Sequence, residues 1–191
     1  MNANLEQILQ TYLQQNLSTK RYNHILSVVA TAIKLGEIYH EDLQKLKIAA
    51  LGHDITKEMN ELEATILINK YFANEEVKNI KPAWHSYTGT IILQEQFKIT
   101  DVQILNAVKY HTLGHKDMDN IAKIIYIADF IEPTRTTPNL AYYQNLVFKD
   151  KHSLNQVLKT IVADNLAYLT SKNFYIPQQS QDLLKSLTSS K

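Results

Sequence analysis

Apolar residues recur every three or four positions along most of the chain, which is the period of one buried helix face. One such stripe runs from Ile25 to Leu35, and either Ser18 or Thr19 can cap its helix, which we expect to begin next to His24. A second stripe, from Leu43 to Leu51, follows the candidate N-cap Asp42. Only four glycines and four prolines interrupt the chain. The pattern predicts an all-α protein.

Further helices are indicated by their start and stop signals. Asn60 with Glu63 resembles a capping box that opens a helix through about Tyr71, and Pro82 suits the first turn of the helix that carries His85. Asp101 can cap a helix over residues 102–110, which leaves through His111 and Gly114.

The segment from Met118 to Ile131 is a nearly continuous apolar run, which predicts a helix too apolar for the surface and stopped by Pro133. Two or three more helices follow Pro138, over residues 154–169 and 178–187 in particular. The last dozen residues are rich in glutamine and serine, and we expect them to fray.

Length and composition favour one soluble domain. A chain of 191 residues with 45% hydrophobic content can bury one core. Twenty basic residues balance 19 acidic ones, so no overall field draws the protein to nucleic acid or to a membrane surface. Neither a signal peptide nor an apolar run long enough to span a membrane is present, so we expect a cytoplasmic protein. With no cysteine, histidine and carboxylate are the only strong metal ligands.

Asp129 is an acidic residue near the end of this apolar run, where a charge is unexpected. A buried carboxylate is costly unless it is paired or bound to a metal. Lys123 and Arg135 are each six positions away, which puts neither on the same helical face, so a metal is the simpler partner. The alternative is a partly exposed aspartate in a surface salt bridge.

Four histidines, His24, His53, His85 and His111, each lie at or near the end of a different predicted helix. Converging helix ends would form a pocket, although any one of these residues alone is more often an ordinary core or surface histidine. The adjacent pair His53 and Asp54 can contact two metals if several elements surround the site.

Four imidazoles and two carboxylates suit Fe, Mn, Zn or Co, and suit neither Ca nor a dedicated Mg site. Two such ions would keep the centre positive after both aspartates are counted, and would attract phosphate. A metal pair also lowers the pKa of water and stabilises both oxygens of an in-line displacement at phosphorus. The pattern therefore favours phosphoester or phosphoanhydride hydrolysis.

In order and spacing, these residues resemble the HD-domain metal phosphohydrolase superfamily. Four segments, 20–24, 52–57, 111–114 and 127–135, are similar to the bacterial YqeK-like family of symmetrical bis(5'-nucleosyl)-tetraphosphatases. The resemblance covers residues 18–170 and implies an HD-domain helical bundle with a dimetal site between helix ends. Residues 1–17 would form an N-terminal helix packed on this core, and residues 171–191 a C-terminal extension.

The resemblance also implies a reaction and a ligand set. Diadenosine tetraphosphate would be split at its centre into two ADP by a metal-bridging hydroxide, with iron as the expected metal. Asp54 would bridge the two ions. The implied metal ligands are His24, His53, Asp54, His85, His111 and Asp129.

Other polar residues are candidates for binding the substrate phosphates. Lys57 follows His53 by four positions and can point to the same site, where we assign it a catalytic and phosphate-binding role. Arg135 matches the Glu-Pro-x-Arg element, Arg21 precedes His24 by one turn, and Thr112 follows His111. The alternatives are solvated surface side chains and a turn cap.

We leave His115 outside the ligand set because Gly114 interrupts its helical spacing from His111, and we expect His40 and His152 at the surface. A platform for stacking adenine is an option for some of six aromatic residues, although packing is favoured for each. These are Tyr87, Tyr110, Tyr126, Phe130, Tyr142 and Tyr143.

Other functions stay open at this point. The chain could be another HD-type phosphohydrolase, acting on a nucleoside mono- or triphosphate or on guanosine tetraphosphate. It could also be an inactive nucleotide-binding module, or a structural helical protein, although the last leaves Asp54 and Asp129 unexplained. Apolar residues near the C-terminus could form a homodimer interface or complete the core.

Overall fold

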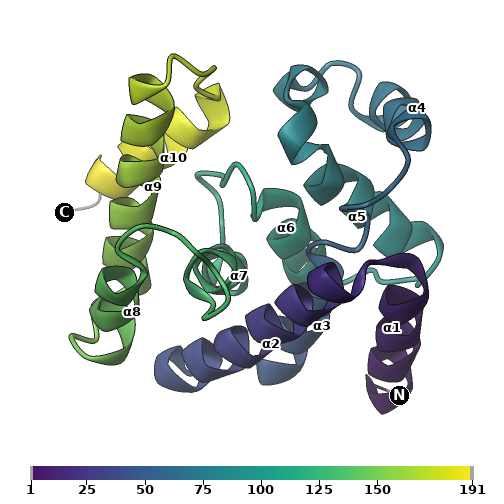
Figure 1. Cartoon of the computed structure of the whole chain (residues 1–191), viewed down its shortest axis with the longest axis horizontal. Coiled ribbons are helices and arrows are strands. Elements are labelled where there is room, and N and C mark those ends of the chain that lie inside the picture. The colour runs from purple at the N-terminus through teal and green to yellow at the C-terminus, as the bar shows by residue number, and fades with distance from the viewer. Residues whose placement is uncertain (1, 190–191) are drawn as a thin grey trace.

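The chain folds into α-helices joined by short loops, with no strand among residues 2–189, which the computed structural model describes (Figure 1). Met1 and residues 190–191, the outer ends of the predicted N-terminal helix and C-terminal extension, lie outside the described residues. The all-α prediction is confirmed. The helices are α1 Asn2–Asn16, α2 Thr19–Tyr39, α3 Leu43–Gly52, α4 Glu61–Tyr71, α5 Trp84–Glu95, α6 Val102–Tyr110, α7 Asn120–Ile131, α8 Leu140–Phe148, α9 Leu154–Ser171 and α10 Gln178–Ser189, with short 3-10 helices η1 Glu76–Asn79 and η2 Lys81–Ala83.

Most of the predicted helix starts are confirmed by their caps. The side chains of Asp42 and Asp101 accept hydrogen bonds from backbone amides in the first turns of α3 and α6. Asn60 caps α4 through one bond, from Leu62 N, rather than through the reciprocal pair expected with Glu63. The expected start of α2 was wrong, because Ser18 caps a helix that begins five residues before His24. His24 therefore lies in the second turn.

Helix α7 is the centre of the fold. It packs against α2, α3, α6, α8 and α9, and most of these helices surround it in Figure 1. Ile121, Ile124, Ile125 and Ile127 are fully or almost fully buried, because their helix has apolar neighbours on several sides. The prediction of a helix too apolar for the surface is confirmed, and the position of Asp129 is set by this packed helix.

Both terminal helices join the main core. Leu9 and Leu13 of α1 are fully buried, and α1 packs against α3. The expected fraying of the C-terminal residues was wrong as far as Ser189, because Leu183 of α10 is only 1% exposed and belongs to the same cluster. The boundaries predicted at residues 17 and 170 stay predictions. No helix in the described part of the chain is long and apolar enough to cross a membrane.

The burial of α1 makes a stability prediction. Leu13→Ala removes a fully buried side chain and leaves a cavity, so we expect the free energy of unfolding to fall by about 2–5 kcal/mol. Ile8, on the same helix, is 47% exposed, and Ile8→Ala should change it by less than about 0.5 kcal/mol. Urea unfolding in the presence of a chelator measures both. Equal effects of the two variants would contradict the packing of α1 on the core.

Candidate metal centre

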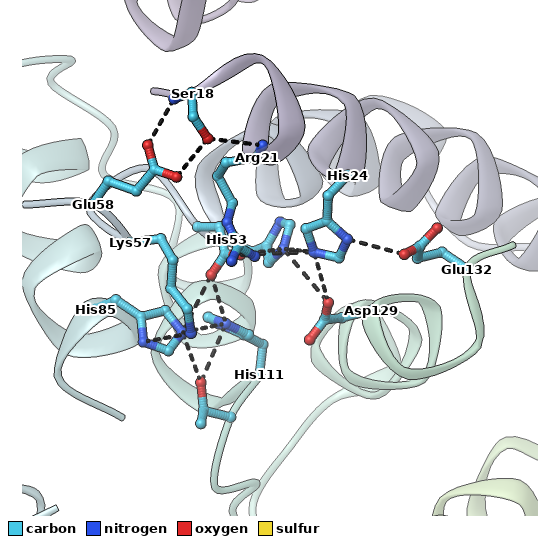
Figure 2. A network of polar contacts seen from close by, with 12 residues as sticks. Ser18, Arg21, His24, His53, Lys57, Glu58, His85, His111, Asp129 and Glu132 are labelled. Atoms are coloured by element: carbon cyan, nitrogen blue, oxygen red, sulfur yellow. Dashed lines mark hydrogen bonds and ion pairs between the residues drawn. The ribbon is translucent and has the colours of Figure 1, made fainter. Parts of the chain in front are cut away.

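The six predicted ligands come together at one place, and they come from five different segments of the chain (Figure 2). His53 and Asp54 follow directly on α3, and His111 follows directly on α6. His85 is the second residue of α5, His24 lies in α2, and Asp129 lies in the last turn of α7.

The ligands form two groups of three. One comprises His24, His53 and Asp129, and the other comprises Asp54, His85 and His111. Within each group, one donor atom per residue lies within 4.8 Å of the other two. The Nε2 atoms of His24 and His53 are 3.4 Å apart, and those of His85 and His111 are 3.1 Å apart. Two groups of three N and O donors suit two divalent ions.

Contacts at the Nδ1 atoms orient three of the four imidazole rings. Nδ1 of His53 and Nδ1 of His111 lie 2.7 and 2.8 Å from the backbone carbonyl oxygens three residues earlier. Nδ1 of His24 lies 3.0 Å from Glu132 Oε1. Carbonyl and ionised carboxylate oxygens only accept, so Nδ1 of His53 and Nδ1 of His111 carry the hydrogen and the Nε2 of each ring keeps its lone pair facing the centre. His24 contacts a carboxylate at both nitrogens, because its Nε2 lies 3.0 Å from Asp129 Oδ1, and hydrogen bonds to these two carboxylates raise its pKa against the opposing effect of burial.

Asp54 contacts both groups of ligands, one with each of its oxygens. Oδ2 lies 3.7 Å from His24 Nε2 and 3.6 Å from His53 Nε2. Oδ1 lies 3.2 Å from His85 Nε2 and 3.7 Å from His111 Nε2. Each oxygen of Asp54 is therefore directed at a different set of imidazoles. Asp54 is only 3% exposed.

The electrostatics favour the protonation state that binds metal. Burial lowers the pKa of His53 to about 4 and holds the pKa of His85 well below its usual value, so both rings are neutral at pH 7. Burial alone would raise the pKa of Asp54 and of Asp129. Nearby histidines outweigh it and lower the pKa of both, with His24 hydrogen-bonding to Asp129. Ionised carboxylates and neutral imidazoles are the metal-binding forms.

Glu132 contacts a predicted metal ligand, and the sequence reasoning missed it. It is fully buried and accepts from His24 through Oε1, at 3.0 Å, and from the backbone amide of Thr134 through Oε2, at 2.7 Å. A buried carboxylate behind a ligating imidazole fixes the ring and raises its basicity. The available signal was its position, as an acidic residue at the end of the apolar run, directly before Pro133.

The expectation that Arg135 could not reach Asp129 was wrong. The chain turns back after α7 ends at Ile131, so Arg135 Nε donates to the backbone oxygen of Asp129 at 2.8 Å and its Nη2 forms an ion pair with the carboxylate. Arg21 makes the equivalent pair with Asp54, with Nη1 2.7 Å from Oδ2. Helical spacing did not apply, because Arg135 lies beyond the helix.

The other predicted phosphate-binding residues lie beside the second group of ligands. Lys57 Nζ is 3.1 Å from His85 Nε2, and Figure 2 shows its side chain directed at that ring. Thr112 Oγ1 is 3.2 Å from Nε2 of both His85 and His111. Together with Arg21 and Arg135, these side chains line a cavity of about 190 Å³ at the centre.

Two of the six aromatic candidates, Tyr126 and Phe130, line this cavity. Tyr87 packs against Phe72, and Tyr143 packs against both Tyr142 and Phe130 without lining the cavity itself. Tyr110 stacks on His115 with ring centroids 4.5 Å apart, in agreement with leaving His115 outside the ligand set.

The C-terminal helix supports the turn that carries His111 and Thr112. Ser180 Oγ donates to Leu113 O at 2.7 Å, and the Gln179 amide donates to Gly114 O. Gly114 has φ +70°, a conformation that favours glycine, and its amide donates to Tyr110 O at 2.8 Å to end α6. The contacts of α10 were not predicted, because they join residues more than 60 positions apart.

Comparison with known proteins identifies the class. A family model described as HD domain matches residues 21–134. A protein of Staphylococcus aureus is 31% identical over 90% of this chain and 88% of its own length, and one of Bacillus subtilis is 34% identical over 84% and 86%. Both are named symmetrical bis(5'-nucleosyl)-tetraphosphatase.

A crystal structure from Clostridium acetobutylicum, described as a predicted HD superfamily hydrolase involved in NAD metabolism, superposes with a TM-score of 0.90. It is 30% identical and covers 97% of both chains. The chain therefore belongs to the HD domain family, the class of helical protein that its fold and histidine–aspartate site define. Within that family it is a homologue of the symmetrical bis(5'-nucleosyl)-tetraphosphatases, so the resemblance found from the motifs is confirmed.

The two groups of ligands predict different metal losses. Asp54 contacts both groups, so Asp54→Ala should reduce the metal content from about two ions per chain to nearly none. Asp129 belongs to one group, so Asp129→Asn should lose about one. Elemental analysis of the purified variants, with His115→Ala as the control, measures this. Equal losses in the two aspartate variants would contradict the assignment.

The Glu132 contact predicts an effect on metal affinity. Glu132→Gln keeps the shape of the side chain but removes the charge behind His24, so affinity should fall about 10–100-fold at the group that contains His24. Competitive titration against a coloured chelator measures this loss. Glu95→Gln, an exposed carboxylate on α5 that pairs with Tyr71, is the control. A change of less than about twofold in Glu132→Gln would show that His24 needs no such support.

Proposed function

We propose that this protein hydrolyses diadenosine tetraphosphate symmetrically to two ADP. The observation that carries the proposal is the pair of His/Asp groups that share contacts with Asp54 inside a cavity lined by three cationic side chains. Its relatives in Staphylococcus aureus and Bacillus subtilis, similar over most of their length, are named for this class of reaction.

The proposed cofactor is a pair of divalent ions, with iron as the expected metal and Mn, Co or Zn as the other candidates. The donors fit such ions, because four imidazoles and two ionised carboxylates suit borderline metals. When bound, the ions would lower the pKa of water and neutralise charge on the phosphate oxygens. Asp54 and Asp129 would keep the ions in place by their charge.

Arg21, Lys57, Arg135 and Thr112 are proposed to bind the phosphates. All four line the cavity, and three of them bring positive charge to a substrate that is a polyanion. Nε of Arg21 is buried and has no hydrogen-bond partner among the residues that the structure describes. A buried donor left without a partner is costly, and a phosphate oxygen would satisfy it. Lys57 is also our proposed catalytic residue, because its ammonium lies beside His85.

The reaction balances with one water molecule. The oxygen of water bonds to one of the two central phosphorus atoms, and the bond from that phosphorus to the central bridging oxygen breaks. One ADP keeps the bridging oxygen and the other takes the oxygen of water. The cationic side chains would hold both halves of the chain in line and stabilise the charge that develops on the leaving oxygen.

The alternatives differ in what they leave unexplained. A catalytically inactive module needs neither a set of six metal ligands nor further contacts that orient them, such as the contact of Glu132 with His24. Action on another nucleotide, such as a nucleoside triphosphate or guanosine tetraphosphate, would use the same centre and is distinguished by the products. The cytoplasmic location expected from the sequence remains part of the proposal, and the homodimer stays one of the two alternatives that the sequence left open.

Product analysis tests the proposal. Metal-replete protein incubated with diadenosine tetraphosphate should release ADP alone, Asp54→Ala should lose at least about 1,000-fold in rate, and His115→Ala should stay within about twofold of wild type. In water enriched in oxygen-18, half of the ADP should carry the label on its terminal phosphate. Release of AMP with ATP, or no turnover, would refute symmetrical cleavage.

A further inference from the structure

A groove of about 410 Å³ lies on the side of the metal centre that α4 and α5 form. Met59, Lys81, Pro82 and Trp84 line it, together with Lys57 and His85. Lys57 and His85 also line the cavity at the metal centre. The groove is therefore adjacent to the cavity at Lys57 and His85. The apolar residues that line it, such as Met59 and Trp84, belong neither to the metal ligands nor to the lining of the first cavity.

Trp84 is one of the apolar residues that line the groove, and a hydrogen bond orients its ring. It is the only tryptophan of the chain and is partly exposed, and its Nε1 donates to Val77 O at 2.9 Å. Lys81 Nζ lies over the ring, 5.7 Å from its centroid, and also pairs with Glu61, which lines the groove as well. An oriented aromatic ring with a mobile lysine over it suits a nucleobase joined to phosphate, because the base can take the place of the ammonium on the ring and the lysine can move to the phosphate charge.

The symmetry of the substrate gives this groove a role. A molecule cut at its centre has two identical halves, which extend from the scissile bond in opposite directions. The first cavity provides Phe130 and Asn165 from α7 and α9, and the groove provides Trp84 from α5. Figure 1 shows α7 and α9 on one side of α6 and α4 and α5 on the other. Each half of the substrate thus has an aromatic residue on its own side of the centre.

We propose that the groove at Trp84 is the binding site for the second nucleoside, with its base stacked on the indole ring and its phosphates held between Lys57 and Lys81. This inference rests on the proposed function. It assigns the cavity at Phe130 to one adenosine and the groove to the other, so that the central phosphates lie at the metal centre. The enzyme would then need two bases for full affinity.

Fluorescence provides a direct test, because all tryptophan emission of the chain comes from Trp84. The probe is a diadenosine tetraphosphate analogue with a methylene group in place of the central bridging oxygen, added to the metal-replete protein. Emission should change saturably, over the same concentrations at which the analogue inhibits turnover. Inorganic tripolyphosphate, which has no base, should leave it unchanged. Equal changes with both probes would overturn the proposal.

Substitutions test the same site by kinetics. Trp84→Ala should raise the KM for diadenosine tetraphosphate about tenfold, whereas Trp84→Phe, which keeps an aromatic face, should stay within about threefold of wild type. Ile66→Ala on α4 is the control, since Ile66 is 57% exposed and lies outside the groove lining. Symmetrical cleavage with an unchanged KM in Trp84→Ala would refute the subsite alone. Failure of the analogue to bind in calorimetry would refute the proposed function as well.

Discussion

The structure depends on burying the carboxylate of Asp54 inside a helical protein. A charge that is 3% exposed is tolerated only with close partners, because burial removes it from water. Asp54 has Arg21 at 2.7 Å and four imidazoles within 3.7 Å. These partners come from α2, α3, α5 and α6, so the position of one carboxylate constrains how four helices can pack. Two divalent ions would complete the compensation of its charge.

The rest of the fold holds these partners still. Helix α7 is packed on several sides, which leaves Asp129 little freedom, and Glu132 at its C-terminal end fixes the ring of His24. The C-terminal helix α10 holds the turn after α6 through Gln179 and Ser180. Rigid support of this kind is what an active site for phosphoryl transfer needs, since its ligands must stay in place as charge moves between oxygens.

The arrangement around the centre also suits a long polyanion. Arg21, Lys57 and Arg135 surround the cavity, and the protein as a whole has a formal net charge of only +1. The cationic side chains therefore gather at the cavity, where Arg21 pairs with Asp54 and Arg135 pairs with Asp129. Aromatic residues line both this cavity and the neighbouring groove, where the proposed substrate would place its two bases.

Much of this protein followed from its sequence, because helix periodicity, caps and ligand chemistry are local properties. The stripes and caps predicted α3 and α6 to the residue at their starts, and the apolar run predicted the central helix α7. The residue types of the six ligands predicted a metal centre, because histidine and carboxylate have few other reasons to accompany buried helix ends. The motifs predicted the family that the comparisons confirmed.

Only the tertiary structure decided which ligands face each other. Nothing in the spacing of His24, His53 and Asp129 shows that they form one group, or that the two oxygens of Asp54 face different groups. The ion pair of Arg135 with Asp129, the contact of Glu132 with His24 and the support from α10 were likewise invisible. Each depends on how the chain turns back beyond a helix end, or on contacts between distant residues, and local patterns carry no information about either.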